Sequence, residues 1–244
     1  MAQVVVITSG KGGVGKSTVS VFLGRAMAAQ GKRVLLMEMD SGLRGLDLML
    51  GMGEQIVYDL SDLLTGRCIA DHAVVPVPSS PGMEVLCAPN NSDYLPDPKI
   101  FVRLVDFFRS YYDVILIDTP AGLGKAVRMS GAAADMSLVV TTPDPVAARD
   151  AAKVSQQMNA MGMKHQRLII NRVPPDFASR GIVEDLDDVI NIVGVQLIGV
   201  VPFSPLVEKS ALTGIELAQS VSARAFDNIG RRLEGQYVPL AFPQ

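Results

Sequence analysis

Nearly continuous apolar runs alternate with longer amphipathic segments along most of this 244-residue chain. Such runs are typical of parallel strands buried on both faces, and the segments between them have helical spacing. The pattern predicts strands at Val4–Thr8, Arg33–Met37, Met83–Ala88, Val114–Asp118, Ser137–Thr141, Arg167–Asn171 and Leu197–Val201. It predicts helices near Ser17–Gln30, Lys99–Ser110, Lys125–Ala133, Pro145–Ala160, Val183–Ile190 and Ser222–Glu234.

Strands that alternate with helices predict an α/β fold with a doubly wound, mostly parallel β-sheet flanked by helices. In such a sheet, functional residues gather at the carboxyl ends of the strands. The length fits one domain, residues 1–244, with an irregular tail over 235–244. The loop-rich stretch Pro76–Gly82 is too short to divide the chain into two domains.

Composition narrows the class of protein. No apolar run approaches the ~20 residues of a membrane span, and the short apolar N-terminal segment does not have the form of a signal peptide. A formal net charge of −3 argues against a strongly basic nucleic-acid surface, although it leaves room for a local patch. Cys68 and Cys87 form no C-x-x-C pair, so we expect buried free thiols and a reducing, cytoplasmic environment.

A glycine-rich loop stands between the first predicted strand and the first predicted helix. Its spacing, G-x-x-x-x-G-K-[ST], is that of a phosphate-binding P-loop when it occurs in this context. Glycines allow several backbone N–H groups to converge on one anion, and the helix N-terminus adds partial positive charge. The alternative is a simple glycine-rich turn. The residues are Gly10, Lys11, Gly12, Gly13, Val14, Gly15, Lys16, Ser17 and Thr18.

Each polar member of this loop has an expected part in binding a nucleoside triphosphate. Lys16 is placed to reach the β- and γ-phosphates, and the Ser17 hydroxyl is placed to ligate Mg²⁺. Lys11 is an additional lysine that an ordinary P-loop does not need, and we expect it at the apex of the loop, pointing away from the sheet. The alternative for Lys11 is a solvated loop residue.

The pattern K-G-G-x-G-K-[ST] resembles the deviant Walker A motif of the MinD/ParA family of ATPases. The resemblance implies ATP and Mg²⁺ as ligands and an ATP-dependent homodimer, in which Lys11 crosses to the phosphates held by the other subunit. It implies slow hydrolysis in the absence of a partner. By this likeness, Lys11, Lys16 and Asp40 are the catalytic residues.

Asp118 closes the apolar run that begins at Val114. An aspartate at this place in a P-loop protein holds Mg²⁺, usually through water, and its alternative role is to cap a turn. Gly122 follows in the next loop, where we expect its backbone N–H near a γ-phosphate. Ser17, Asp118 and Asp40 are therefore the expected metal-site residues.

The segment Glu38–Asp47 resembles the Asp-x-Asp-x-Gly-Leu-Arg-x-Leu-Asp pattern of the MinD members of this family, and the likeness continues through Leu48–Gly66. It implies that Asp40 positions or activates the attacking water. The alternative for Asp40 is a solvated loop acid. Glu38 stands where the family usually has aspartate. We expect this longer carboxylate to reach the water shell of Mg²⁺ and to tune hydrolysis rather than abolish it.

The nucleotide base also has expected contacts. Asn171 ends a predicted strand, Arg172 follows it, and Pro202 lies in the loop after the last predicted strand. The resemblance implies that Asn171 hydrogen-bonds the adenine edge and that the Pro202 loop closes the other side. The alternative for Asn171 is a turn residue. The preference for ATP over GTP rests on the resemblance alone.

The resemblance extends from about residue 2 to about residue 234 and favours a regulator of division-site placement. MinD-type proteins end in an amphipathic membrane helix, whereas residues 235–244 here contain two prolines and no basic residue, which disfavours direct membrane binding. The apolar stripe Ala225, Phe226, Ile229 and Leu233 is typical of a core-packing helix. We expect a cytoplasmic protein with a protein activator or inhibitor and only a weak case for peripheral membrane attachment.

Two other functions remain open from the sequence. One is an ATP-switched docking module of the flagellar-placement or secretion type, which the missing membrane helix favours. The other is a DNA-segregation ATPase of the ParA type. DNA binding needs a clustered basic face. Arg224, Arg231 and Arg232 are the hints of one, and they are too few to support it.

Overall fold

A central sheet of eight strands organises the part of the chain that the structure describes. The structure is a computed structural model, and it describes residues 1–41, 45–89, 94–174, 177, 186–214 and 220–240. The strand order is β3-β4-β2-β5-β1-β6-β7-β8. All neighbours are parallel except β3 and β4, which pair antiparallel at one edge. The predicted α/β fold with a mostly parallel sheet is confirmed.

The strands lie close to their predicted positions. Strands β2, β5 and β6 consist entirely of buried residues, because helices cover both faces of the sheet. The edge strand β3 was not predicted, since two residues give no readable alternation. The bounds are β1 (Gln3–Thr8), β2 (Val34–Glu38), β3 (Val75–Pro76), β4 (Met83–Leu86), β5 (Val114–Asp118), β6 (Met136–Thr141), β7 (Gln166–Val173) and β8 (Leu197–Pro202).

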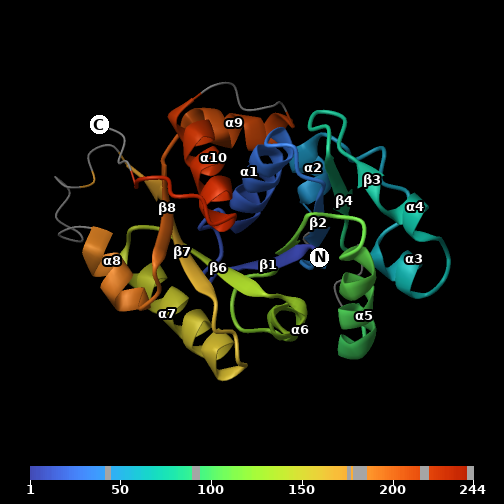
Figure 1. The fold of residues 1–244 in the computed structure, drawn as a ribbon, viewed down its shortest axis with the longest axis horizontal. Coiled ribbons are helices and arrows are strands. Elements are labelled where there is room, and N and C mark those ends of the chain that lie inside the picture. Colours follow the sequence, from blue (N-terminus) through green and yellow to red (C-terminus); the bar gives the residue numbers. More distant parts are fainter. Residues whose placement is uncertain (42–44, 90–93, 175–176, 178–185, 215–219, 241–244) are drawn as a thin grey trace.

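Helices pack on both faces of this sheet (Figure 1). One layer comprises α1 (Lys16–Ala29), α2 (Leu46–Leu50), α9 (Pro205–Thr213) and α10 (Val221–Leu233). The other comprises α5 (Pro98–Phe108), α6 (Lys125–Ala133), α7 (Pro145–Ala160) and α8 (Leu186–Val193), with α3 (Leu60–Leu64) and α4 (Ala70–Ala73) beside the β3 edge.

The two faces of the sheet supply separate parts of the core. Alternate strand residues point to opposite faces, so Leu36 packs in the cluster beneath α1 and Leu35 packs in the cluster beneath α5. Phe22 of α1 stacks on Phe226 of α10, with 5.5 Å between the ring centroids. The apolar stripe of α10 is thus part of the core, as predicted.

Four helices escaped prediction. Helices α2, α3 and α4 have five, five and four residues, which is too short for a helical period to be recognised. Helix α9 was also missed. The helix predicted at Val183–Ile190 begins among residues that lie outside the described part, and the helix observed there is Leu186–Val193. Among the described residues, no helix has the length and apolar character needed to cross a membrane.

The irregular segment after α10 is held by one arginine. Arg232 donates hydrogen bonds to the carbonyl oxygens of Ile198, Val238 and Pro239, at 2.8, 2.9 and 2.7 Å. The predicted irregular tail is thereby fastened beside β8 as far as it is described. Tyr237 is 93% exposed, so this segment turns its tyrosine to solvent.

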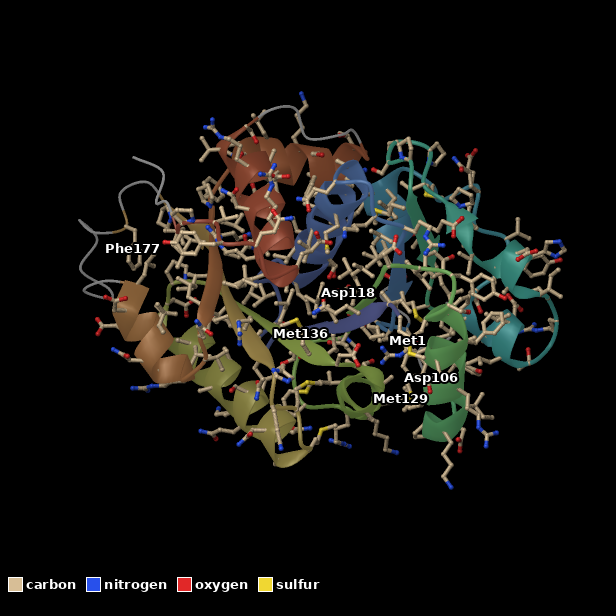
Figure 2. All side chains as sticks on the ribbon, viewed as in Figure 1. Met1, Asp106, Asp118, Met129, Met136 and Phe177 are labelled. Carbon is tan, nitrogen blue, oxygen red and sulfur yellow. The ribbon has the colours of Figure 1, made fainter. Side chains whose placement is uncertain are left out.

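Arg109 connects three elements at the amino end of the sheet. It donates to the carbonyl oxygen of Ala2 at 3.0 Å and to that of Ala133 at 3.1 Å. Its guanidinium also forms a two-pronged ion pair with Asp135, at 2.7 and 3.0 Å. Asp106, labelled on α5 in Figure 2, accepts a further bond at 3.2 Å.

We expect Arg109→Met to lower the free energy of unfolding by about 2–3 kcal/mol, because it leaves the carbonyl groups of Ala2 and Ala133 without this donor and removes the ion pair with Asp135. Urea denaturation measures the change. Arg103→Met, on an exposed position of the same helix, is the matched control and is expected to change stability by less than about 0.5 kcal/mol. Equal losses in the two variants would contradict the structural role of Arg109.

Candidate active site

The P-loop connects β1 to α1 through glycines in conformations that other residues rarely adopt. Gly13 and Gly15 have φ angles of +80° and +86°, in the left-handed region that favours glycine. A Cβ atom added to Gly12 or Gly13 would meet no atom within 4 Å. The loop therefore lies beside open space, as a phosphate cradle requires. Helix α1 begins at Lys16, so its N-terminal N–H groups face the same region.

The start of the loop is packed against α7. A Cβ atom at Gly10 would lie 2.2 Å from the carbonyl carbon and oxygen of Asp150, a distance that no side chain can occupy. Lys11, the next residue, is exposed, as predicted for the loop apex. Its charge acts on Asp144, which caps the start of α7. Burial raises the pKa of Asp144, but hydrogen bonds from Thr142 and Ala147 and the charge of Lys11 outweigh this and lower it.

Asp118 is the centre of the polar cluster beneath the loop. It lies buried at the end of β5, between the sheet and α1 (Figure 2). Its carboxylate accepts hydrogen bonds from the Ser17 hydroxyl at 2.7 Å and from the Ser20 hydroxyl at 2.8 Å, and Lys16 Nζ lies 3.5 Å away. The structure thus brings together Lys16, Ser17 and Asp118, as predicted.

Ser20 is the member of this cluster that sequence reasoning missed. It lies one helical turn after Lys16, so it shares the face of α1 that carries Lys16 and Ser17 toward Asp118. The Ser20 hydroxyl also lies 3.1 Å from the Lys16 carbonyl oxygen. The helical spacing was a signal that could have revealed it.

Asp40 lies within electrostatic reach of this cluster. It is half-buried in the loop after β2. Burial raises the pKa of its carboxyl, the charge of Lys16 lowers it, and the charge of Asp118 raises it, with a net upward shift. A carboxylate with a raised pKa beside a lysine and a second carboxylate is typical of a functional site.

Glu38 has a different environment from the one we expected. Its Oε1 atom accepts hydrogen bonds from the backbone N–H groups of Gly45 and Leu46 at 2.9 and 3.1 Å, and its Oε2 atom accepts from Ala88 at 3.3 Å. The side chain is buried and holds the start of α2 against the end of β4. The expected reach toward a metal's water shell is therefore not what this geometry shows, because backbone groups engage both oxygens.

A cavity of about 360 Å³ lies beside the P-loop. The ends of β7 and β8, helix α9 and Met49 of α2 form its walls. The Asn171 side-chain amide donates to the Val14 carbonyl oxygen at 2.8 Å and thereby supports the P-loop. The lining residues are Thr18, Met49, Asn171, Arg172, Val201, Pro202, Phe203, Ser204, Val207, Glu208, Ala211 and Leu212. The predicted base-binding residues thus line one cavity.

Arg172 has an unusual backbone at the edge of this cavity. Its φ angle is +56°, and it is the one non-glycine residue with a positive φ among those that the structure describes. It lies next to a shift in the register between β7 and β8. Its guanidinium donates to the Gly13 carbonyl oxygen at 2.7 Å and lies 3.6 Å from Glu208 of α9. Arg172 thus connects α9 to the P-loop. The Ser-Pro-x-x-Glu sequence at 204–208 was a readable start signal for this missed helix.

Helix α9 also touches α2 very closely. Both helices end on glycines with positive φ, Gly51 at +70° and Gly214 at +69°. A Cβ atom on Gly214 would lie 2.7 Å from the Cα and N atoms of Gly51. The helix that borders the base cavity is therefore in backbone contact with the helix that follows Asp40.

Gly122 lies next to the P-loop as predicted, but its N–H group is engaged. It donates to the Ser9 carbonyl oxygen at 2.8 Å, and its φ angle is +92°. Contact between this N–H and a γ-phosphate therefore requires the bond to Ser9 to break.

Within the described residues, no group of three or more His, Cys, Asp or Glu side chains could hold a metal ion.

Comparisons with known proteins also indicate a nucleotide-binding protein. Residues 5–217 match the CobQ/CobB/MinD/ParA nucleotide-binding domain family. The chain is 38% identical over 244 residues to the septum site-determining protein MinD of Synechocystis, covering 98% of this chain and 92% of that protein. It is 35% identical over 249 residues to MinD of Bacillus subtilis, with the same two coverages, 98% and 92%.

Solved structures of MinD proteins are also similar to this chain. A MinC:MinD cell division protein complex from Aquifex aeolicus contains a chain with a TM-score of 0.91 and 33% identity, and the match covers 99% of both chains. MinD of Pyrococcus horikoshii, solved with Mg-ADP, has a TM-score of 0.85 and 25% identity over 96% of each chain.

We expect the stability difference between Glu38→Gln and the parent chain to depend on pH. Burial raises the pKa of Glu38 to about 7, against the opposing hydrogen bonds from Gly45, Leu46 and Ala88. The folded state therefore binds more protons than the unfolded state between the unfolded pKa and 7, and the parent chain loses stability as pH rises through this window. The variant does not titrate here.

Lowering the pH from 8 to 5 is expected to stabilise the parent chain relative to the variant by up to ~3 kcal/mol. Urea denaturation of both proteins without Mg²⁺ measures the difference at each pH. A difference that stays constant would show that Glu38 is ionised throughout and that its three backbone donors outweigh burial.

Proposed function

This chain belongs to the MinD/ParA family of P-loop nucleotide-binding proteins and is an ATPase of the MinD type, and on that premise we propose that it binds ATP with Mg²⁺, dimerises and regulates where the division septum forms. The observation that carries the proposal is the cluster of Lys16, Ser17 and Asp118 beneath an open glycine loop, with Asp40 beside it. The curated relatives are named for the determination of the septum site.

The residues of the cluster fit a magnesium ion. Mg²⁺ prefers oxygen ligands, keeps several waters and is usually bound through one or two carboxylates together with substrate phosphates. The Ser17 hydroxyl and the Asp118 carboxylate provide such oxygens 2.7 Å apart. When bound, the ion would supply positive charge to the phosphates. We propose that Ser17 holds it directly, and that Asp118 holds it through water with Asp40 nearby.

We propose that the P-loop and the base cavity bind the two ends of ATP. The N–H groups of residues 10–18 and the Lys16 ammonium bind the phosphates. Adenine occupies the cavity between β7, β8 and α9. Because the Asn171 amide nitrogen is committed to Val14, the adenine amino group would donate to the Asn171 side-chain oxygen. Arg172 and Pro202 border the base.

Hydrolysis then follows from positioning and electrostatics. Asp40 accepts a hydrogen bond from a water molecule and orients its oxygen toward the γ-phosphorus. The new P–O bond forms as the bond to the β–γ bridging oxygen breaks, and ADP leaves. The water's proton passes to the released phosphate. Lys16 balances the charge from its own subunit, and Lys11 reaches the other subunit of the dimer, so the monomer turns over slowly.

We propose that a protein partner sets the rate of this cycle. The Aquifex relative was solved in a complex of MinC with MinD, and a protein that binds the ATP dimer is the corresponding partner here. The ATP dimer is the state that acts, and hydrolysis times its release. We place the protein in the cytoplasm, and attachment of its ATP dimer to the inner face of the cell membrane is a property to be tested.

Asp40→Ala is expected to reduce ATP turnover by a factor of about 100 or more while the ATP-dependent dimer persists, because it removes the group that orients water but not the groups that bind phosphate. Phosphate release and light scattering after gel filtration measure the two properties. Lys11→Ala is expected to lose both turnover and the dimer. Turnover within about twofold of the parent chain in Asp40→Ala would overturn the role of Asp40.

The same Asp40→Ala dimer tests membrane attachment. Co-sedimentation with anionic liposomes in ATP, but not in ADP, is expected if the dimer attaches directly. A dimer in solution that does not sediment would show that any attachment requires a partner.

Ser20→Ala is expected to raise the Mg²⁺ concentration for half-maximal activity several-fold, because Asp118 loses one of its two hydroxyl donors and its orientation. A magnesium titration of ATP turnover measures this. The matched control is Ser130→Ala, another buried serine, whose hydroxyl makes no hydrogen bond to any part of the chain that the structure describes. A metal requirement that moves equally in both variants would assign Ser20 a merely structural role.

A further inference from the structure

A second cavity lies far from the nucleotide site. It is a half-open groove of about 540 Å³ between the end of α5 and the edge formed by α4, β3 and β4. It borders the amino ends of β2 and β4, whereas the P-loop lies at the carboxyl ends of the strands. The five residues of β2 separate the two sites by about 16 Å. Figure 1 shows α4, β3, β4 and α5 together on this side.

Aromatic side chains form one wall of this groove. Phe107 and Tyr111 lie on its rim and are 48% and 54% exposed, which is high for such large side chains. Their rings are 5.0 Å apart between centroids. Buried apolar residues also line the groove, among them Val74 and Phe108. A surface of this kind marks a binding site more often than an isolated exposed ring does.

The groove also holds two carboxylates without a positive partner. Glu84 lies within β4, on the face of the sheet opposite the buried Met83 and Val85, and its side chain accepts a hydrogen bond from the Tyr112 hydroxyl. Asp71 acts electrostatically on the same tyrosine. Within the described structure, neither carboxylate forms an ion pair. Burial and the bond to Glu84 raise the pKa of Tyr112, so the hydroxyl stays a donor.

The arginine that lines the groove does not balance this charge. Arg33 lines the groove, but its guanidinium donates to both oxygens of Asp113, at 2.9 and 3.3 Å. Its charge is therefore matched by a carboxylate of its own. The groove keeps a net negative charge beside exposed aromatic faces, and both features attract a cation.

We propose that this groove binds a segment of a partner protein that presents an arginine or lysine between apolar side chains. The basic head group pairs with Glu84 and Asp71, its stem lies along Phe107 and Tyr111, and the flanking apolar residues cover the rim. The negative charge excludes an anionic membrane surface and nucleic acid. Because the groove lies at the opposite end of the sheet, the segment binds whether or not nucleotide is present.

Fluorescence anisotropy with the full chain tests this binding. The probe is a labelled, end-blocked octapeptide of alternating arginine and leucine, and a peptide of alternating glutamate and leucine is its control. We expect a dissociation constant on the order of 100 μM at 0.15 M salt, no binding of the acidic peptide, and the same affinity with and without ATP.

Two variants of the groove are compared with one control. Glu84→Gln removes the charge and keeps an oxygen for the Tyr112 hydroxyl, and Phe107→Ala removes an exposed ring. Each is expected to weaken binding at least ~5-fold. Asp187→Asn removes an equal charge from an exposed site on α8 at the other edge of the sheet, and is expected to leave binding unchanged. Thermal unfolding of each variant confirms that it is folded.

Three results would overturn the proposal. Unchanged binding in Glu84→Gln and Phe107→Ala would place the peptide elsewhere. An equal loss in Asp187→Asn would show attraction by net charge alone. Free arginine amide that displaces the peptide at equal concentration would assign the groove to a small organic cation instead of a protein segment. None of these results bears on ATP turnover, so they are separable from failure of the proposed ATPase role.

Discussion

The hydrogen-bonded contact between Asp118 and the first turn of α1 is the interaction on which the site depends. A carboxylate at the centre of the molecule carries a large desolvation cost unless donors surround it. Two serine hydroxyls and a lysine provide those donors, and all three come from one helix. The same contact that makes the buried charge tolerable therefore fixes α1, and with it the P-loop, over the central strands.

The rest of the site is arranged around this fixed point. Asp150 of α7, together with Asn171 and Arg172 of β7, contacts the P-loop from two different elements. Glu38 fastens the start of α2, and α2 in turn touches α9. Loop residues that act on phosphate are thus held by rigid strands and helices, which is how a site maintains catalytic geometry without covalent chemistry.

The sequence was sufficient for the sheet apart from the edge strand β3, for the longer helices apart from α9, and for the placement of Lys16, Ser17 and Asp118. Each of these depends on local pattern: apolar runs, helical spacing, or a motif of fixed length. The bonds of Glu38 and of the Gly122 N–H depend on which backbone groups the tertiary fold brings near, and local pattern does not contain that information. The aromatic groove could not be predicted from the sequence for the same reason, because only the tertiary fold brings residues 71, 84 and 107 together.

Two glycines that contact neighbouring main-chain atoms, Gly10 and Gly214, restrict which substitutions this sequence can accept during evolution. At 38% identity to the Synechocystis relative, most positions differ between two chains of one family. A side chain at Gly10 would overlap Asp150 main-chain atoms, and one at Gly214 would overlap those of Gly51. No compensating change of another side chain can relieve an overlap with main-chain atoms. Evolution can therefore replace much of the core piecemeal, whereas these two positions can change only if whole helices move apart.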